Sequence, residues 1–73
     1  MVMKIIGIKE IHSEKKGDFV VLYTVREKKG VNGLYAEEIF LDRPSFPSGI
    51  AVNDDADFQF DSDGRLDSIN KLK

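Results

Sequence analysis

The chain has 73 residues, of which 33% are charged, with a formal net charge of −2 and no cysteine. A chain of this length is expected to form a single domain over residues 1–73, whose small core supplies only about 3–5 kcal/mol of net stability. The lack of cysteine excludes disulfides and cysteine-bound zinc, and the negative charge argues against a general polyanion binder. No apolar run approaches the roughly 20 residues of a membrane span, and the first residues do not resemble a signal peptide. We therefore expect a cytoplasmic protein that does not contact a membrane.

Charge is unevenly distributed along the chain. Residues 1–33 contain seven Lys or Arg and four Asp or Glu, whereas residues 34–73 contain four and nine. Such an asymmetry can mark a binding face, or it can simply keep a small domain soluble.

The first two strands are expected over residues 3–11 and 18–27. The first, KIIGIKEI at its centre, is rich in β-branched isoleucine, and Gly7 in its middle predicts a bulge or a sharp bend. The second, DFVVLYTVRE, is apolar on both alternating faces, which indicates a central strand. We assign its Phe19–Val21–Tyr23–Val25 side to the core.

A third strand is expected over residues 34–41, LYAEEIFL. Helical spacing of some apolar residues leaves half a helix as an alternative, but the short length and the preceding Asn32-Gly33 turn favour a strand. The following DRPSFPSG contains two prolines, which prevent a regular helix or ladder, so at most one helical turn fits there. Phe46, between the prolines, is expected to close one end of the domain.

The last two strands are expected over residues 55–61 and 65–70, on either side of the acidic run DSDG. A calcium loop with Gly64 at its sixth position would need a carboxylate at the first position and Glu at the twelfth. Gln59 and Asn70 stand there instead, so we interpret the segment as a hairpin with a left-handed Gly64. The three-residue step from Leu66 to Ile69 indicates either a bulge or a terminal helical turn.

These elements predict an all-β domain, a small five-stranded antiparallel barrel that is OB-like (oligonucleotide-binding) or SH3-like. So few strands rarely close fully, and the remaining edge is a possible route to a homodimer. The expected core consists of Ile6, Ile8, Phe19, Val21, Val25, Leu34, Ile39 or Phe40, Val52, Phe58, Phe60 and Leu66.

Nothing in the sequence forms a catalytic set. His12 is the only histidine and is expected at the surface of a strand end, and its neighbour Ser13 points to the opposite face of that strand. Gly30 and Gly33 are not followed by the residues of a phosphate-binding loop. We therefore expect no enzyme, no metal and no cofactor.

Single-stranded nucleic acid is bound by aromatic rings that stack on bases and by basic side chains that follow the phosphates. The candidates of this kind lie in and beside the first two loops: Lys15, Lys16, Arg26, Lys28, Lys29 and Tyr35. Tyr23 is a second aromatic candidate, although the core is its more frequent place. Glu37 and Glu38 lie close by and would repel phosphates.

The order of these segments resembles small proteins encoded by phages and conjugative elements of Gram-positive bacteria. Their ending, VGD-x-V-x-V-x-Y-x-x-x-G-K-hydrophobic, is matched here by Val52, Asn53, Asp54, Phe58, Phe60, Gly64, Arg65 and Leu66. Asn53 replaces the glycine of that ending, and the acidic DSDG replaces a more basic tip. Some of these proteins are similar to the single-stranded DNA-binding proteins of filamentous phages, which are five-stranded OB barrels that form dimers.

The resemblance implies a single-stranded nucleic-acid-binding accessory protein of a phage or mobile element. The alternative is a protein-interaction module that acts on a partner, such as a host enzyme, through the acidic half of the chain.

Overall fold

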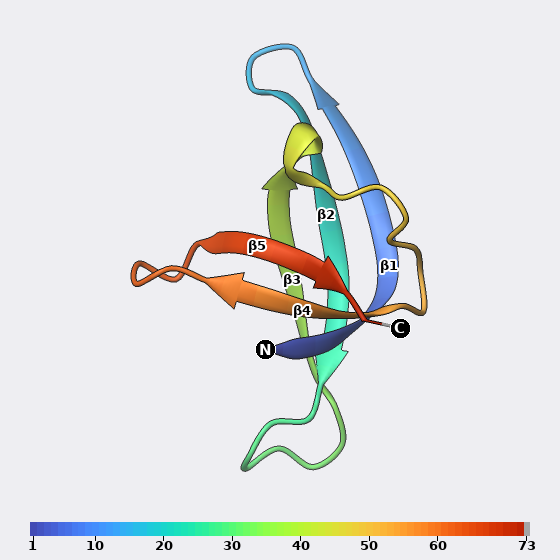
Figure 1. The fold of residues 1–73 in the computed structure, drawn as a ribbon, viewed down its shortest axis with the longest axis vertical. Coiled ribbons are helices and arrows are strands. Elements are labelled where there is room, and N and C mark those ends of the chain that lie inside the picture. Colours follow the sequence, from blue (N-terminus) through green and yellow to red (C-terminus); the bar gives the residue numbers. More distant parts are fainter. Residues whose placement is uncertain (73) are drawn as a thin grey trace.

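The computed structural model describes residues 1–72 and consists of five antiparallel strands with one short 3₁₀ turn (Figure 1). Their bounds are β1 Val2–Ser13, β2 Gly17–Arg26, β3 Tyr35–Asp42, η1 Arg43–Ser45, β4 Asp55–Phe60 and β5 Leu66–Lys71. All five predicted strands are confirmed to within two residues at each end, and residues 34–41 form a strand, not half a helix. None of the helical structure in residues 1–72 has the length and apolar character needed to cross a membrane.

The strands form one sheet in the order β3-β2-β1-β4-β5. β1 is shared: residues 4–13 pair with β2, while Val2, Met3 and Lys4 pair with β4. The register of β1 shifts between Ile5 and Gly7, which confirms the predicted irregularity and makes Ile6 the extra residue of a bulge. Bending there lets the β4–β5 hairpin cross over the β1–β2–β3 sheet at a steep angle (Figure 1). Within residues 1–72, β3 and β5 do not pair with each other, so the sheet is open and the predicted barrel is not confirmed.

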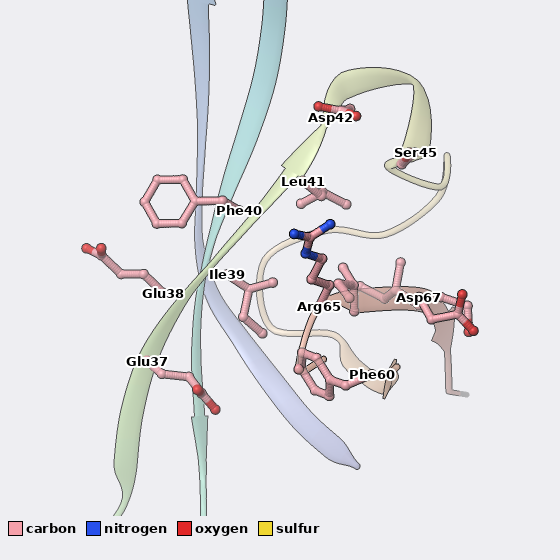
Figure 2. Close-up of a pocket in the computed structure, with 14 residues that line it drawn as sticks. Glu37, Glu38, Ile39, Phe40, Leu41, Asp42, Ser45, Phe60, Arg65 and Asp67 are labelled. Atoms are coloured by element: carbon pink, nitrogen blue, oxygen red, sulfur yellow. The ribbon is translucent and has the colours of Figure 1, made fainter. Parts of the chain in front are cut away.

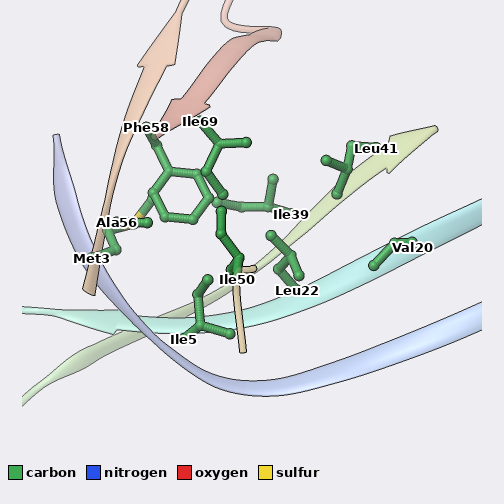
Figure 3. Packing of buried hydrophobic residues seen from close by; sticks show 10 residues of the cluster. All are labelled: Met3, Ile5, Val20, Leu22, Ile39, Leu41, Ile50, Ala56, Phe58 and Ile69. Atoms are coloured by element: carbon green, nitrogen blue, oxygen red, sulfur yellow. The ribbon is translucent and has the colours of Figure 1, made fainter. Parts of the chain in front are cut away.

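The core lies between the β1–β2–β3 sheet and the β4–β5 hairpin (Figure 3). Phe58 from the hairpin is 1% exposed and contributes the largest fully buried side chain. The buried cluster is formed by Met3, Ile5, Val20, Leu22, Ile39, Leu41, Ile50, Ala56, Phe58 and Ile69. Thr24 is also fully buried, and its hydroxyl donates to the Glu37 carbonyl oxygen at 3.2 Å. That bond satisfies the one buried hydroxyl of β2.

The predicted core was partly wrong because β2 is apolar on both faces. The face of β2 that packs against the hairpin is Val20–Leu22–Thr24, and Phe19, Tyr23 and Val25 lie half-buried on the opposite face. Val21 is buried as predicted, but on that same opposite face. The bulge in β1 decides between the two faces, since it places Ile5 inward and leaves Ile6 exposed.

Other members of the predicted core fall into two groups. Ile39 and Phe58 are buried as predicted, and Ile8 and Leu66 are partly buried and pack against the cluster. Four predicted core residues are instead exposed, three because they lie in loops or at a strand end and Phe40 because it lies on the face of β3 opposite to the core. They are Leu34, Phe40 (the alternative to Ile39), Val52 and Phe60.

The connection from β3 to β4 contains the single helical turn, η1, with Pro44 in its first turn. Phe46 is partly buried against the core, and Ile50 is 7% exposed and belongs to it. Arg43 forms an ion pair with Glu10, which fastens η1 to β1. Asp54 closes the far end of this segment by accepting from the Ala51 amide at 2.8 Å.

The acidic run between β4 and β5 is a hairpin turn, as predicted. The Asp61 carboxylate accepts from the backbone N–H groups of Asp63 and Arg65, both at 2.9 Å, and Gly64 has φ = +81°. The oxygen of Asp61 that a calcium loop would use therefore bonds the turn itself. The register between β4 and β5 shifts at Gln59/Phe60, so Asp67 is an extra residue and the last strand is bulged.

Candidate nucleic-acid interface

The predicted binding residues lie at two opposite ends of β2. Lys15 and Lys16 occupy the β1–β2 loop, and Lys28 and Lys29 occupy the β2–β3 loop. The ten residues of β2 separate these loops, which corresponds to about 30 Å of strand. Figure 1 shows the two loops at opposite ends of the long axis, which extends over 40 Å. The six residues therefore do not form one continuous patch.

Three of the predicted residues do come together at the β2–β3 end. Arg26 is the cross-strand partner of Tyr35, and its guanidinium lies 5.1 Å from the Tyr35 ring centre. The Lys28 ammonium lies 4.3 Å from the same centre. Both distances are typical of cation–π contacts. Arg26 also lies 3.5 Å from the Glu37 carboxylate. Cations thus already lie against the Tyr35 ring, where a stacking base would have to compete with them.

A second aromatic surface lies on the face of β1–β2–β3 that points away from the core. We call it the outer face. Cross-strand pairing assigns to it Lys4, Gly7, Lys9 and Ile11 of β1, Phe19, Val21, Tyr23 and Val25 of β2, and Ala36, Glu38, Phe40 and Asp42 of β3.

The outer face is apolar along β2 and more polar on both sides. Val21 is only 2% exposed, although no second layer within residues 1–72 covers this face, because its cross-strand partners Lys9 and Phe40 flank it. The Tyr23 ring lies over Gly7, where an added Cβ would approach its Cδ2 to 3.2 Å. Phe40 is 59% exposed, the most open aromatic ring of this surface.

The outer face has basic residues beside its rings. Lys4 and Lys9 are exposed on β1, next to Val25 and Val21 respectively. Lys16 from the β1–β2 loop borders a shallow depression of about 250 Å³ that is also lined by Phe19 and Phe40. Glu38 and Asp42 add two carboxylates along the β3 margin. Of the predicted binding residues, Lys16 therefore belongs to this surface, whereas Arg26, Lys28 and Tyr35 belong to the other end.

Sequence reasoning missed Phe19 and Phe40 as surface rings because it assigned Phe19 to the core. The pattern Ile39–Phe40–Leu41 contains one usable signal. Successive side chains of a β-strand point to opposite faces of the sheet. If Ile39 and Leu41 both face the core, Phe40 between them must therefore face outward.

Outside these surfaces, His12 lies at the exposed end of β1 as predicted, with its Nδ1 2.9 Å from Asp18 Oδ1. This pair is exposed to solvent, and the hydroxyl of the neighbouring Ser13 accepts from the Lys16 backbone N–H at 3.1 Å.

Comparisons with protein families, with curated proteins and with solved structures found no match to this chain.

Proposed function

We propose that this chain is a non-enzymatic, single-stranded nucleic-acid-binding protein with an OB-like architecture, acting as an accessory protein of a phage or mobile element. The observation that carries the proposal is the outer face, where exposed and half-buried rings on β2 and β3 lie beside lysines of β1 and the β1–β2 loop. Rings on neighbouring strands offer sequence-tolerant stacking surfaces, and lysines beside them neutralise phosphates.

The strand order supports the OB-like interpretation. In an OB fold, a five-stranded, partly open Greek-key barrel, the ligand runs over the face of strands 2 and 3 and the loops between strands 1 and 2 and between strands 4 and 5. Here β1 pairs with both β2 and β4, and β3 and β5 are the two ends of the sheet. A single strand crossing β2 and β3 would meet Phe40, Phe19 and then Lys16 and Lys15 in the first loop.

The negative net charge predicts modest affinity that depends strongly on salt. Only a few lysines lie along this path, and Glu38 and Asp42 oppose them. Because affinity that comes from phosphate neutralisation falls steeply with added salt, binding should be measurable at about 20 mM salt and weak at about 200 mM.

The experiment is a fluorescence-anisotropy titration of labelled oligo-dT at these two salt concentrations, with two charge reversals compared. Lys9→Glu lies on the outer face, and Lys29→Glu lies in the β2–β3 loop. We expect Lys9→Glu to weaken binding by about tenfold and Lys29→Glu to weaken it less. A larger loss for Lys29→Glu than for Lys9→Glu would place the interface at the Tyr35 end instead. If the unmodified protein does not bind oligo-dT at about 20 mM salt, the proposed function is wrong.

A further inference from the structure

The two end strands of the sheet leave a groove between them, which we call the seam. β3 and β5 are the two strands with a partner on one side only. The groove between them has a volume of about 490 Å³ and is lined along β3 from Glu37 to Asp42 and along the hairpin by Phe60 and by Gly64 to Ile69 (Figure 2). The open edge of the sheet is therefore also a concave site.

The floor of the seam is apolar. Ile39 and Leu41 point from β3 toward the hairpin, and Phe60 and Arg65 lie across from them (Figure 2). Phe60 is 38% exposed, so one ring of the rim is free to contact a ligand. A side chain that enters from the solvent would meet Ile39 on one wall and the Phe60 ring on the other.

The rim of the seam is acidic. Four acidic residues line it, Glu37, Glu38, Asp42 and Asp67, against the single guanidinium of Arg65, and the Glu38 and Asp42 side chains lie on its outer-face side. Arg26 lies 3.5 Å from Glu37 and neutralises part of that charge from behind. The remaining charge disfavours a phosphate backbone and favours a ligand with lysine or arginine side chains.

β3 has the length and the free backbone of a docking strand. Its eight residues pair with β2 along one side, and an edge strand presents unpaired N–H and C=O groups along its other side. An extended peptide that pairs with such an edge gains main-chain hydrogen bonds, and alternate side chains give it specificity.

We propose that the seam binds an extended basic segment of a partner protein, which adds to the sheet as a strand along β3. Alternate apolar side chains of that segment enter the groove beside Ile39, and its lysines or arginines, which point to the other side of the sheet, lie near the Glu38 and Asp42 carboxylates. The seam shares Glu38, Phe40 and Asp42 with the outer face, so the two proposed interactions meet along β3.

A second copy of the chain fits this edge less well. Antiparallel pairing of β3 with itself about Glu38 would place the Glu38 side chains of the two copies directly opposite each other. Like charges that face each other across a strand pair are destabilising. A basic strand in the same place replaces this repulsion with attraction.

The test uses a capped eight-residue peptide in which Lys and Val alternate, titrated into the ¹⁵N-labelled protein and followed by NMR. We expect shifts at β3 and β5, including Ile39 and Leu66. A peptide with Glu in place of Lys, and a Lys peptide with alternate amides N-methylated, should each bind at least about tenfold more weakly. Equal binding of the Lys and Glu peptides, or shifts confined to the outer face or to Tyr35, would overturn the proposal.

A matched pair of charge reversals separates the seam from overall charge. Asp42→Lys lies on the acidic side of the seam along β3, and Glu14→Lys lies in the exposed β1–β2 loop, outside the residues that line the seam. We expect the first to weaken the Lys–Val peptide about fivefold and the second to leave its affinity unchanged, with both variants folded by their NMR spectra. Equal losses of peptide affinity in the two variants would show that the effect comes from net charge and would refute a specific seam. A dimer in sedimentation equilibrium whose interface covers β3 and excludes the peptide would also refute it.

Discussion

The rings of Phe19 and Phe40 lie 6.4 Å apart between their centres, tilted by 38°, on the face of the sheet opposite to the core. They come from neighbouring strands and sit on a diagonal of the cross-strand register, since Phe40 pairs with Val21 and Phe19 pairs with Asp42. Aromatic pairs of this kind stabilise a sheet by about 0.5–1.5 kcal/mol. They also keep two rings in fixed positions at the surface.

Replacing Phe40 with Ala should therefore separate binding from stability. The ring is 59% exposed, so we expect a loss of at most about 1–1.5 kcal/mol in the free energy of unfolding. If oligo-dT stacks on the outer face, the same change should weaken its binding by about tenfold, since one stacked base contributes about 1–3 kcal/mol. Chemical denaturation and anisotropy titration measure the two effects.

The control for this change is Phe60→Ala. Phe60 is also an exposed ring, at 38% exposure, but it lies on the seam and not on the outer face. We expect it to leave oligo-dT affinity unchanged and to weaken the Lys–Val peptide. If both substitutions reduce oligo-dT binding equally, the outer face is not the stacking surface.

Glu38→Lys should change the two proposed interactions in opposite directions. The side chain is exposed on β3, where it belongs to the outer face through its pairing with Tyr23 and also lines the seam. Converting it to a cation adds a phosphate contact and removes an attraction for a basic peptide. We expect tighter oligo-dT binding with a steeper salt dependence, by about one unit of the log–log slope, and severalfold weaker binding of the Lys–Val peptide. A change in the same direction for both ligands would contradict the assignment of one of the surfaces.

The sequence was sufficient to predict the strands because a glycine with positive φ stands in or next to every connection between them. Gly17 and Gly64 have φ of +79° and +81° in the first and last hairpin turns, as a residue without a side chain permits. Gly7 marks the bulge of β1, where the Tyr23 ring leaves little room for a Cβ.

The sequence pattern could not predict which face of β2 packs against the core, or which of the binding residues lie together. Val20 and Val21 are adjacent and both almost fully buried, so the alternation of apolar residues does not show which face of β2 packs against the core. Only the pairing of β1 with both β2 and β4 defines that face. Lys16 and Lys28 are both lysines and only twelve positions apart in the sequence, but the strand between them places them at opposite ends of the molecule (Figure 1). The local sequence does not show this separation, which follows only from how β2 pairs with β1 and β3.

Asn53 offers a test of the turn before β4. It is the one non-glycine residue with positive φ, +77°, within residues 1–72, and it stands where the ending described above has glycine. Its N–H donates to the Ile5 carbonyl oxygen at 2.7 Å, next to the β1 bulge. Since asparagine tolerates this region and alanine does not, Asn53→Ala should cost about 1 kcal/mol of unfolding free energy, and Asn53→Gly should be within about 0.5 kcal/mol of the unmodified protein. Equal losses for both variants would show that the Asn side chain, and not the backbone angle, matters.

Asp57 should make the stability of the fold depend on pH in the acid range. The Met1 ammonium donates to its carboxylate at 2.7 Å, and the Gln59 amide donates to it at the same distance. These two hydrogen bonds, that from the ammonium first, lower the pKa of Asp57 below its ordinary value of 3.8. A carboxylate with a depressed pKa stabilises the folded state above its unfolded pKa, and this contribution is lost as the pH falls through the folded pKa.

Asp57→Asn keeps the shape and one acceptor oxygen but removes the charge. We expect this variant to melt below the unmodified protein by a constant margin from pH 7 to about pH 5, and the margin to shrink as the pH falls below 3.8. The control is Asp63→Asn at the hairpin tip, which also removes one carboxylate but leaves the backbone bond from Asp63 N–H to Asp61 in place. Thermal melts of the three proteins between pH 2.5 and pH 7 give the answer. A margin for Asp57→Asn that stays constant below pH 3, or that Asp63→Asn reproduces, would show that the ammonium–carboxylate contact contributes nothing to folding.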